Sequence, residues 1–300
     1  YQPLPMNHTS SYMSDVVKKE IEVARPYGLT GEDPKEVLSF EKSDITMHAG
    51  GGTIATASDL SLFLIAQLGQ GKVNGKQIFP AEVIKKSHQQ LAVHDETFLD
   101  FKRTGYAWGW RIGPYKGKKM FHHFGGVEGT HTHSSFIPDH NIGLVVLNNE
   151  NYISQDLTNA IADIAYSILL DDGDANKIAE NHILAMQVSA AEVKGKISAW
   201  NKLKVQKAAS RVMELSLDKQ KYVGAFHHPL WGKLNIKLLK SGVFEIRLGE
   251  VSTVATAFTK LDTMRVEFPA MGEGGKVLTY KIKDGEVKGL SLFGEKFSKV

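Results

Sequence analysis

The sequence predicts an α+β chain in which helices and antiparallel strands precede a small all-β barrel or sandwich. Two observations support this fold class. In the first part of the chain, stretches with apolar residues at helical spacing are mixed with stretches of period two. From residue 219 to residue 300 the period is two throughout, and roughly eight short strands fit into about 80 residues.

Three helices and four strands are expected before residue 171. One helix begins at Ser58 as its N-cap and ends at the glycines after Leu68, and a second opens at Pro80. A third covers residues 154–170, with Ser154 as its cap and one apolar face. The strands, expected from alternation between turn residues, are 106–112, 119–124, 131–137 and 142–147.

The polar run at residues 171–174 marks a domain edge. Beyond it, Ser189 and Glu192 match a capping box ahead of a helical stripe that includes Trp200, and this stripe is expected to pack as core. We therefore divide the chain into residues 1–172, a helical connector at 173–216 and an all-β domain at 217–300.

Composition excludes several functions. The chain is 42% hydrophobic and 23% charged, with a formal net charge of +3 and no basic run of the kind that binds nucleic acid. No apolar stretch reaches the roughly 18 residues needed to span a bilayer. The absence of cysteine excludes thiolate catalysis and Cys-type zinc sites. The chain starts at Tyr1 without a signal peptide, as expected of a trimmed chain.

Five segments together resemble the C-terminal half of the class C β-lactamase-like superfamily, which includes penicillin-binding proteins, D-aminopeptidases and esterases. Their order and spacing over more than a hundred residues make the resemblance specific. The last 80 residues resemble the lipocalin-like barrel appended to some members, through Tyr222-Val223-Gly224 and the Asp284-Gly285 hairpin signal. The five segments are Gly50–Leu60, Gly71–Ile78, Gly105–Trp110, the run His123-Phe124-Gly125-Gly126, and Ile142–Asn148.

The resemblance implies a serine hydrolase that acts through an acyl-enzyme on an amide, ester or lactam bond, without a cofactor. Its substrate would be a small peptide, an ester or a β-lactam. His123 and Gly126 would be catalytic, with the Gly126 N–H as half of an oxyanion hole, where losing one donor costs about 2.7–4 kcal/mol. Phe124 and Gly125 would bind substrate, because glycines let it lie against the strand without meeting a Cβ.

His123 stands where many members have lysine. A histidine with a pKa near 6.5 is mostly neutral at pH 7 and can donate or accept a proton. This favours peptidase, amidase or esterase chemistry over that of a classical β-lactamase. We expect the activity of the complete enzyme to follow a histidine titration between pH 5 and pH 8.

The nucleophile of the resembling family is not recognisable. Its Ser-x-x-Lys motif occurs at Ser39–Lys42 and Ser216–Lys219, the number that 20 serines and 30 lysines in 300 residues produce by chance. The family's Tyr-x-Asn motif does not occur, and Tyr12-Met13-Ser14 is a degenerate variant. We expect the nucleophile to lie upstream and this chain alone to be inactive. The alternative is a non-catalytic peptidoglycan- or ligand-binding protein.

Five histidines lie within residues 122–140. His131 and His133 share one side of their strand at a spacing that can bind zinc, with Glu128 or Asp139 as conceivable further ligands, but no metal site is predicted. His122 is expected to face away from His123 and to be structural, and a slip of one residue would exchange them. Trp108 and Trp110 are expected to pack against the sheet rather than to line a cleft.

The resemblance also implies that the sheet is shared with a missing N-terminal half. Unpaired strand edges invite association, so we expect a partner chain or self-association. Because the superfamily is mostly exported, the expected location is periplasmic or extracellular.

Overall fold

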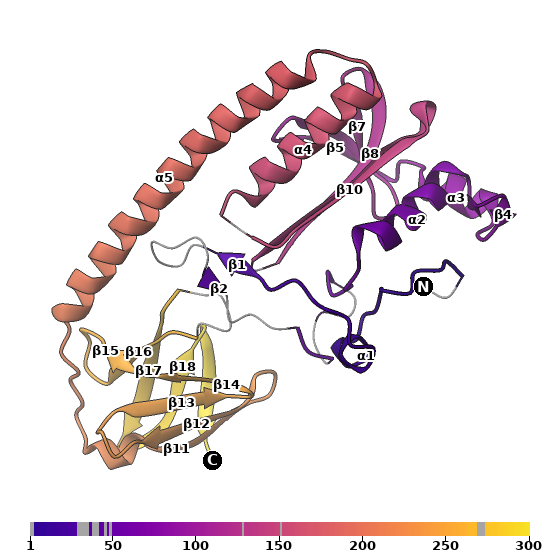
Figure 1. Ribbon diagram of the computed structural model, residues 1–300. Helices are drawn as coiled ribbons and strands as arrows, with labels where there is room; N and C mark the ends of the chain where they lie inside the picture. The colour runs from indigo at the N-terminus through magenta and orange to yellow at the C-terminus, as the bar shows by residue number, and fades with distance from the viewer. Residues whose placement is uncertain are drawn as a thin grey trace. The chain divides into compact units, whose positions relative to one another are not determined.

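The computed structural model describes residues 3–28, 36–37, 42–44, 47, 50–127, 129–150, 152–268 and 274–300. The chain divides into two compact units, Tyr1–Ile197 and Ser198–Val300, each described here by itself. Both contain antiparallel sheets, and the first unit adds helices, which confirms the α+β class (Figure 1). No helix among the described residues is both long and apolar enough to cross a bilayer.

The first unit is built on a six-stranded antiparallel sheet in which the spatial order of the strands follows the chain. The predicted strand at 106–112 is wrong, because residues 107–110 form the turn between two strands and Gly109 adopts a φ of +75° there. The strands are β5 Ala92–Phe98, β6 Phe101–Tyr106, β7 Arg111–Tyr115, β8 Lys118–Val127, β9 Thr130–Ile137 and β10 Ile142–Asn148.

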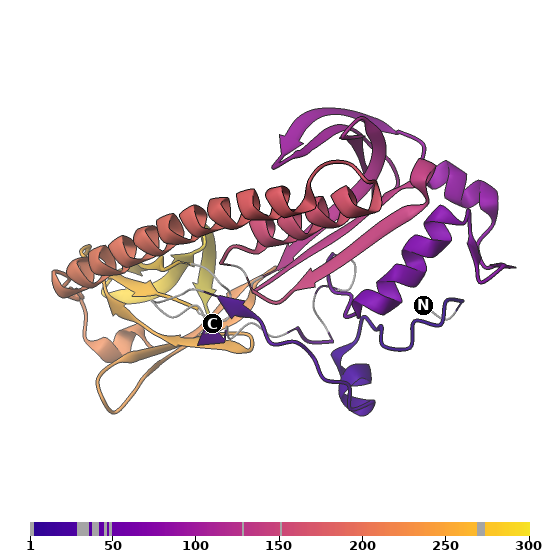
Figure 2. The same ribbon diagram turned by 45° about the horizontal axis from the view of Figure 1, so that its top comes forward.

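Helices α2 (Ala57–Leu68) and α4 (Ser154–Leu169) cover opposite faces of this sheet (Figure 2). Successive strand residues point to opposite faces. On β8 and β9, Phe121 and Phe136 therefore pack with Leu64 of α2, whereas Met120 and Ile137 pack with Tyr166 of α4. The two apolar layers bury the centre of the sheet on both sides.

Smaller elements surround the sheet. The chain before α2 is tied to it by the carboxylate of Asp59, which accepts bonds from the His8 N–H and the Thr9 hydroxyl, both at 2.8 Å. These elements are α1 Met13–Lys18, β1 Tyr27–Gly28, β2 Glu36–Val37, β3 Lys72–Val73, β4 Lys76–Gln77 and α3 Ala81–Ser87, the last opening after Pro80 as expected, with a short 3-10 turn at Pro138–His140.

Two of the predicted N-caps are wrong. Helix α2 is capped by Thr56, whose side chain accepts from the Asp59 N–H, and not by Ser58. Ser154 is the first residue of α4 and not its cap. The cap position is Ile153, no side chain caps the helix, and the carboxylate of Glu150 accepts from the N–H groups of Tyr152 and Ile153 just ahead of α4.

Helix α5 (Ala175–Ala209) is longer than expected and begins earlier. Asp174 starts it by accepting from the N–H groups of Asn176 and Lys177. The predicted capping box at Ser189 is wrong, because Ser189 lies inside the helix and donates to Asp156 at 2.9 Å. No side chain of α5 is fully buried and Trp200 is half exposed, so the predicted apolar stripe of this helix is not part of a hydrophobic core.

The second unit is a single nine-stranded antiparallel sheet. Its two edge strands, β14 and β15, are separated in the chain only by Ala255, so the sheet curls round until its edges nearly meet. This nearly closed barrel resolves the choice between barrel and sandwich. The strands are β11 Gly224–His228, β12 Gly232–Leu238, β13 Phe244–Leu248, β14 Val251–Val254, β15 Thr256–Ala257, β16 Thr263–Val266, β17 Lys276–Lys283, β18 Glu286–Leu292 and β19 Glu295–Lys299.

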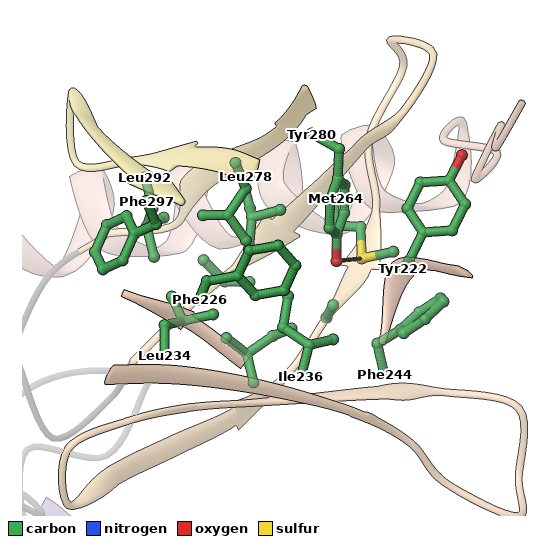
Figure 3. Packing of buried hydrophobic residues seen from close by; sticks show 14 of the residues in the cluster. Tyr222, Phe226, Leu234, Ile236, Phe244, Met264, Leu278, Tyr280, Leu292 and Phe297 are labelled. Carbon is green, nitrogen blue, oxygen red and sulfur yellow. Dashed lines mark hydrogen bonds between the residues drawn. The ribbon is translucent and has the colours of Figure 1, made fainter. Parts of the chain in front are cut away.

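The interior of the nine-stranded sheet is packed with its own side chains (Figure 3). Phe226, Leu234 and Ile246 on neighbouring strands are fully buried. The hydroxyl of Tyr222 donates to Asp262, and that of Tyr280 lies 3.8 Å from the sulfur of Met264. Interiors of small barrels are commonly filled in this way.

Gly113 allows β7 to approach β6, which makes its replacement a test of this packing. An ideal Cβ at this position would lie 1.7 Å from the backbone oxygen of Lys102, and no side-chain rotation can relieve that clash. We expect Gly113→Ala to lower the free energy of unfolding by about 3 kcal/mol or more. The control is Gly195→Ala in α5, where a Cβ meets nothing within 4 Å and the gain is about 1 kcal/mol. Equal denaturation midpoints for the two variants would contradict the strand arrangement.

Candidate active site

One end of β8 has a free edge. Strand β7 pairs with β8 only as far as Arg111 opposite His122, so among the described residues the segment 123–127 pairs only with β9. Gly126 is exposed and Gly125 half-buried on this segment. A free edge offers backbone donors and acceptors to an extended ligand. The segment therefore has the backbone chemistry to bind a substrate as an added strand.

His122 and His123 lie on opposite sides of β8, as strand alternation requires. His122 is 1% exposed, stacks on Phe124 with ring centroids 4.8 Å apart, and accepts from Arg103 Nε at 3.2 Å. His123 is exposed. The register of the hairpin thus puts His122 in the packed layer beneath α4 and leaves His123 free to meet a ligand.

The hydrogen bonds of His123 define its tautomer. Its Nδ1 lies 3.0 Å from the carbonyl oxygen of Phe124, which can only accept, so Nδ1 carries the proton. Nε2 of the neutral ring then accepts from the Tyr106 hydroxyl at 3.3 Å. Tyr106 was not predicted as a site residue, because this contact joins two strands 17 residues apart in the chain.

The His123 ring favours its neutral form. Although His123 is exposed at the surface, neighbouring side chains partly enclose its ring, and its pKa lies below the ordinary histidine value mainly because this enclosure reduces the hydration of the charged ring. The guanidinium groups of Arg111 and Arg103 add repulsion. The bond to Phe124 only partly opposes this effect. His123 is therefore a neutral proton acceptor at pH 7 rather than a cation.

Two hollows flank the pair Gly125 and Gly126. One, of about 680 Å³, lies between residues 21–24 and 50–56 and the ends of β8–β10, and both glycines line it. The other, of about 360 Å³, is lined by the same glycines together with His123, Phe124, His131, Phe98, Gln155 and the two arginines Arg103 and Arg111. The predicted residues His123, Phe124, Gly125 and Gly126 thus meet around one hollow.

The glycines have separate steric roles. A Cβ at Gly125 would lie 2.9 Å from Oγ1 of Thr132 on β9. At Gly126 the nearest atom is Cδ2 of His131 at 3.5 Å, an ordinary contact. Gly125 is thus needed for strand packing, whereas the protein itself leaves room at Gly126.

A row of buried polar side chains connects β9 to α4. His131 Nδ1 lies 2.9 Å from the Thr158 hydroxyl. His133 Nε2 lies 2.7 Å from the Ser135 hydroxyl, which is 2.7 Å from the Tyr166 hydroxyl. Burial lowers the pKa of His133 to about 3. These contacts hold α4 against the sheet.

The two histidines considered for zinc are both engaged in this row. Within the described part of the chain, no three His, Asp or Glu side chains are grouped to hold a metal ion. Glu128, the conceivable further ligand, lies outside the described residues.

The remaining sequence candidates separate in the structure. Trp110 is buried against Phe136 at 4.9 Å as expected, whereas Trp108 is 47% exposed. Ser216 donates to Asp262 and Lys219 to the Gly242 carbonyl, both in the second unit, so they do not form a nucleophile–base pair. Ser39 and the start of the glycine run at 48–49 lie outside the described residues.

Comparison with known proteins identifies the family of the first unit. The family model described as Beta-lactamase matches residues 1–166. A search of curated proteins found no match.

Among solved structures, the octameric penicillin-binding protein homologue from Pyrococcus abyssi is 20% identical with a TM-score of 0.47, and the match covers 99% of this chain and 58% of that one. SurE is 13% identical with a TM-score of 0.35, covering 93% and 56%. The chain therefore spans less than two thirds of these structures.

The buried histidines make stability depend on pH. His133 has a pKa of about 3 in the fold and about 6.5 when unfolded, so the unfolded chain binds the proton more readily between these values. Stability is therefore complete above about pH 6.5 and falls as the pH drops toward 3, by up to about 1.4 kcal/mol per pH unit. We expect His133→Gln to show a shallower loss than the wild type in denaturation at pH 7, 6 and 5. The exposed His140→Gln is the control, and identical slopes for all three proteins would refute the assignment.

Proposed function

Because the chain belongs to the β-lactamase family, we propose that it forms part of a serine hydrolase that cleaves an amide, ester or lactam bond through an acyl-enzyme. The observation that carries this proposal is the free edge of β8, where His123, Gly125 and Gly126 meet beside a hollow. A serine attacks the substrate carbonyl, and water then releases the acyl group. No cofactor is required for these steps.

In this proposal the substrate pairs with the free edge of β8. The Gly126 N–H is half of the oxyanion hole, and Phe124 and Gly125 contact the substrate. A Cβ at Gly126 would make only ordinary contacts within the protein, the nearest with His131 at 3.5 Å, so the protein's own packing does not require glycine there, which supports a role toward a ligand. Neutral His123 accepts or returns a proton at Nε2, with the Tyr106 hydroxyl as its neighbour. Its lowered pKa moves the expected titration below 6.5.

The nucleophile in this proposal comes from outside the chain. Neither Ser216 nor Lys219 lies in the first unit, and no Tyr-x-Asn motif occurs in the sequence. An upstream half of the protein would supply both groups. The proposed substrates are small peptides, short esters or β-lactams, and neutral His123 supports peptidase, amidase or esterase chemistry. We further propose that the nine-stranded sheet is lipocalin-like and that the protein is exported to the periplasm or the extracellular space.

Fluorophosphonate labelling read by intact mass tests the proposal. We expect no adduct on the 300-residue chain, because Ser216 bonds to Asp262 in the second unit and Ser135, which contacts His133, is fully buried. We expect one adduct on the longer gene product that includes the upstream segment, and none after its Ser-x-x-Lys serine is changed to alanine. An adduct on the short chain would show that the nucleophile is internal. A longer product that stays unlabelled would favour a non-catalytic binding protein.

The outer edge of β10 is the surface at which we expect a partner chain or a second copy to associate. Among the described strands β10 pairs only with β9, and exposed edges promote association. We expect the chain alone to form dimers or larger species in light scattering after gel filtration. Leu147→Lys, which places a charge on β10 at a side chain 37% exposed, should reduce them. Leu230→Lys, in the second unit, should not, and a monomeric wild type would contradict the proposal.

A further inference from the structure

The hollow beside His123 contains an arginine pair that the proposed chemistry does not use. Nη1 of Arg103 and Nη1 of Arg111 lie 3.2 and 2.9 Å from the same oxygen of Glu96. The two arginine side chains are 12% and 27% exposed, whereas Glu96 is 45% exposed. One half-exposed carboxylate thus serves two largely buried guanidinium groups.

Both guanidinium groups are held in place by aromatic rings. Arg103 lies over Phe98 at 4.6 Å and over Phe124 at 5.6 Å, and Arg111 lies over Tyr106 at 5.0 Å. Arg103 also donates Nε to His122. Because these contacts fix the guanidinium planes before a ligand arrives, little side-chain entropy is lost on binding.

The local charge leaves one positive charge uncompensated. The nearby rings of His122 and His123 are neutral at pH 7, since burial and the arginines lower their pKa values, that of His122 to about 3. Among the described residues, the two guanidinium groups thus share the carboxylate of Glu96, and Arg111 also lies 3.0 Å from Nδ1 of His94, so this cluster has one more cation than anion. An arginine can bind a carboxylate through two parallel hydrogen bonds.

The position of Glu96 allows it to be replaced. Strand β5 is an edge strand, and a register irregularity between Val93 and Glu96 brings Glu96 opposite Arg103. Such bulges often redirect a side chain next to a binding site. A ligand carboxylate can displace Glu96, because this side chain lies at the exposed edge and can turn into solvent.

From these contacts we infer that the hollow is a carboxylate subsite in which Glu96 is a resident counter-ion that a ligand displaces. Arg103 and Arg111 hold the incoming carboxylate, and Phe98 and Phe124 contact the apolar body attached to it. The inference rests on the proposed function, in which the substrate or the leaving group would carry an acidic group on an apolar body. In this inference the two arginines, and not the neutral His123, supply the positive charge that attracts the carboxylate of the ligand.

Calorimetric binding of benzoate to the 300-residue chain at low ionic strength tests this subsite. We expect benzoate to bind and neutral benzamide not to bind. Glu96→Gln should tighten benzoate binding about tenfold, because it removes the internal competitor while keeping the shape. Arg103→Gln and Arg111→Gln should each weaken it at least about tenfold. Lys102→Gln, which removes an exposed positive charge from the same strand, should leave it unchanged.

Three results would overturn the inference: arginine variants that bind benzoate as the wild type does, no gain in Glu96→Gln, or inorganic phosphate binding as tightly as benzoate. Circular dichroism of each variant distinguishes a lost site from a lost fold. Benzoate binding is measured on the 300-residue chain and does not require the serine nucleophile. Benzoate can therefore fail to bind while the longer product is labelled, and it can bind while the longer product stays unlabelled.

Discussion

The register of β8 against β9 is the constraint on which the candidate site depends. Phe121 and Phe136 are opposite each other in this register, and their rings stack 5.0 Å apart beneath α2. Because side chains alternate along a strand, this buried pair decides which side every later residue of β8 occupies. His122 consequently lies in the packed layer and His123 at the ligand side. The burial of the two aromatic rings thus determines that His123 lies on the side where a ligand can bind.

Burial also determines the charges around the site. The protein keeps His122 and His133 neutral by removing them from water, whereas Arg103 and Arg111 stay charged because they retain a carboxylate partner and aromatic contacts. The site therefore combines neutral imidazoles with fixed cations a short distance away. This division suits proton transfer at one point and anion recognition at another.

The sequence-based predictions were correct for strand alternation and wrong for the residue at which each of three helices begins. Alternation predicted the strands of the β8–β9 hairpin to within three residues at each end. The caps at Ser58, Ser154 and Ser189 were wrong: Thr56 caps α2, no side chain caps α4, and Asp174 accepts at the start of α5. Several residues near a helix start can act as a cap, and only the path of the chain selects among them.

The sequence by itself determined the fold class and the family of the first unit, because apolar periodicity and the spaced motifs are properties of short segments. It also located the residues 123–126 that meet beside one hollow. Only the tertiary structure decided the contact of His123 with Tyr106 and the pairing of Glu96 with two arginines. These contacts join strands separated in the chain, and their geometry follows from strand register and a β5 irregularity that sequence patterns do not record.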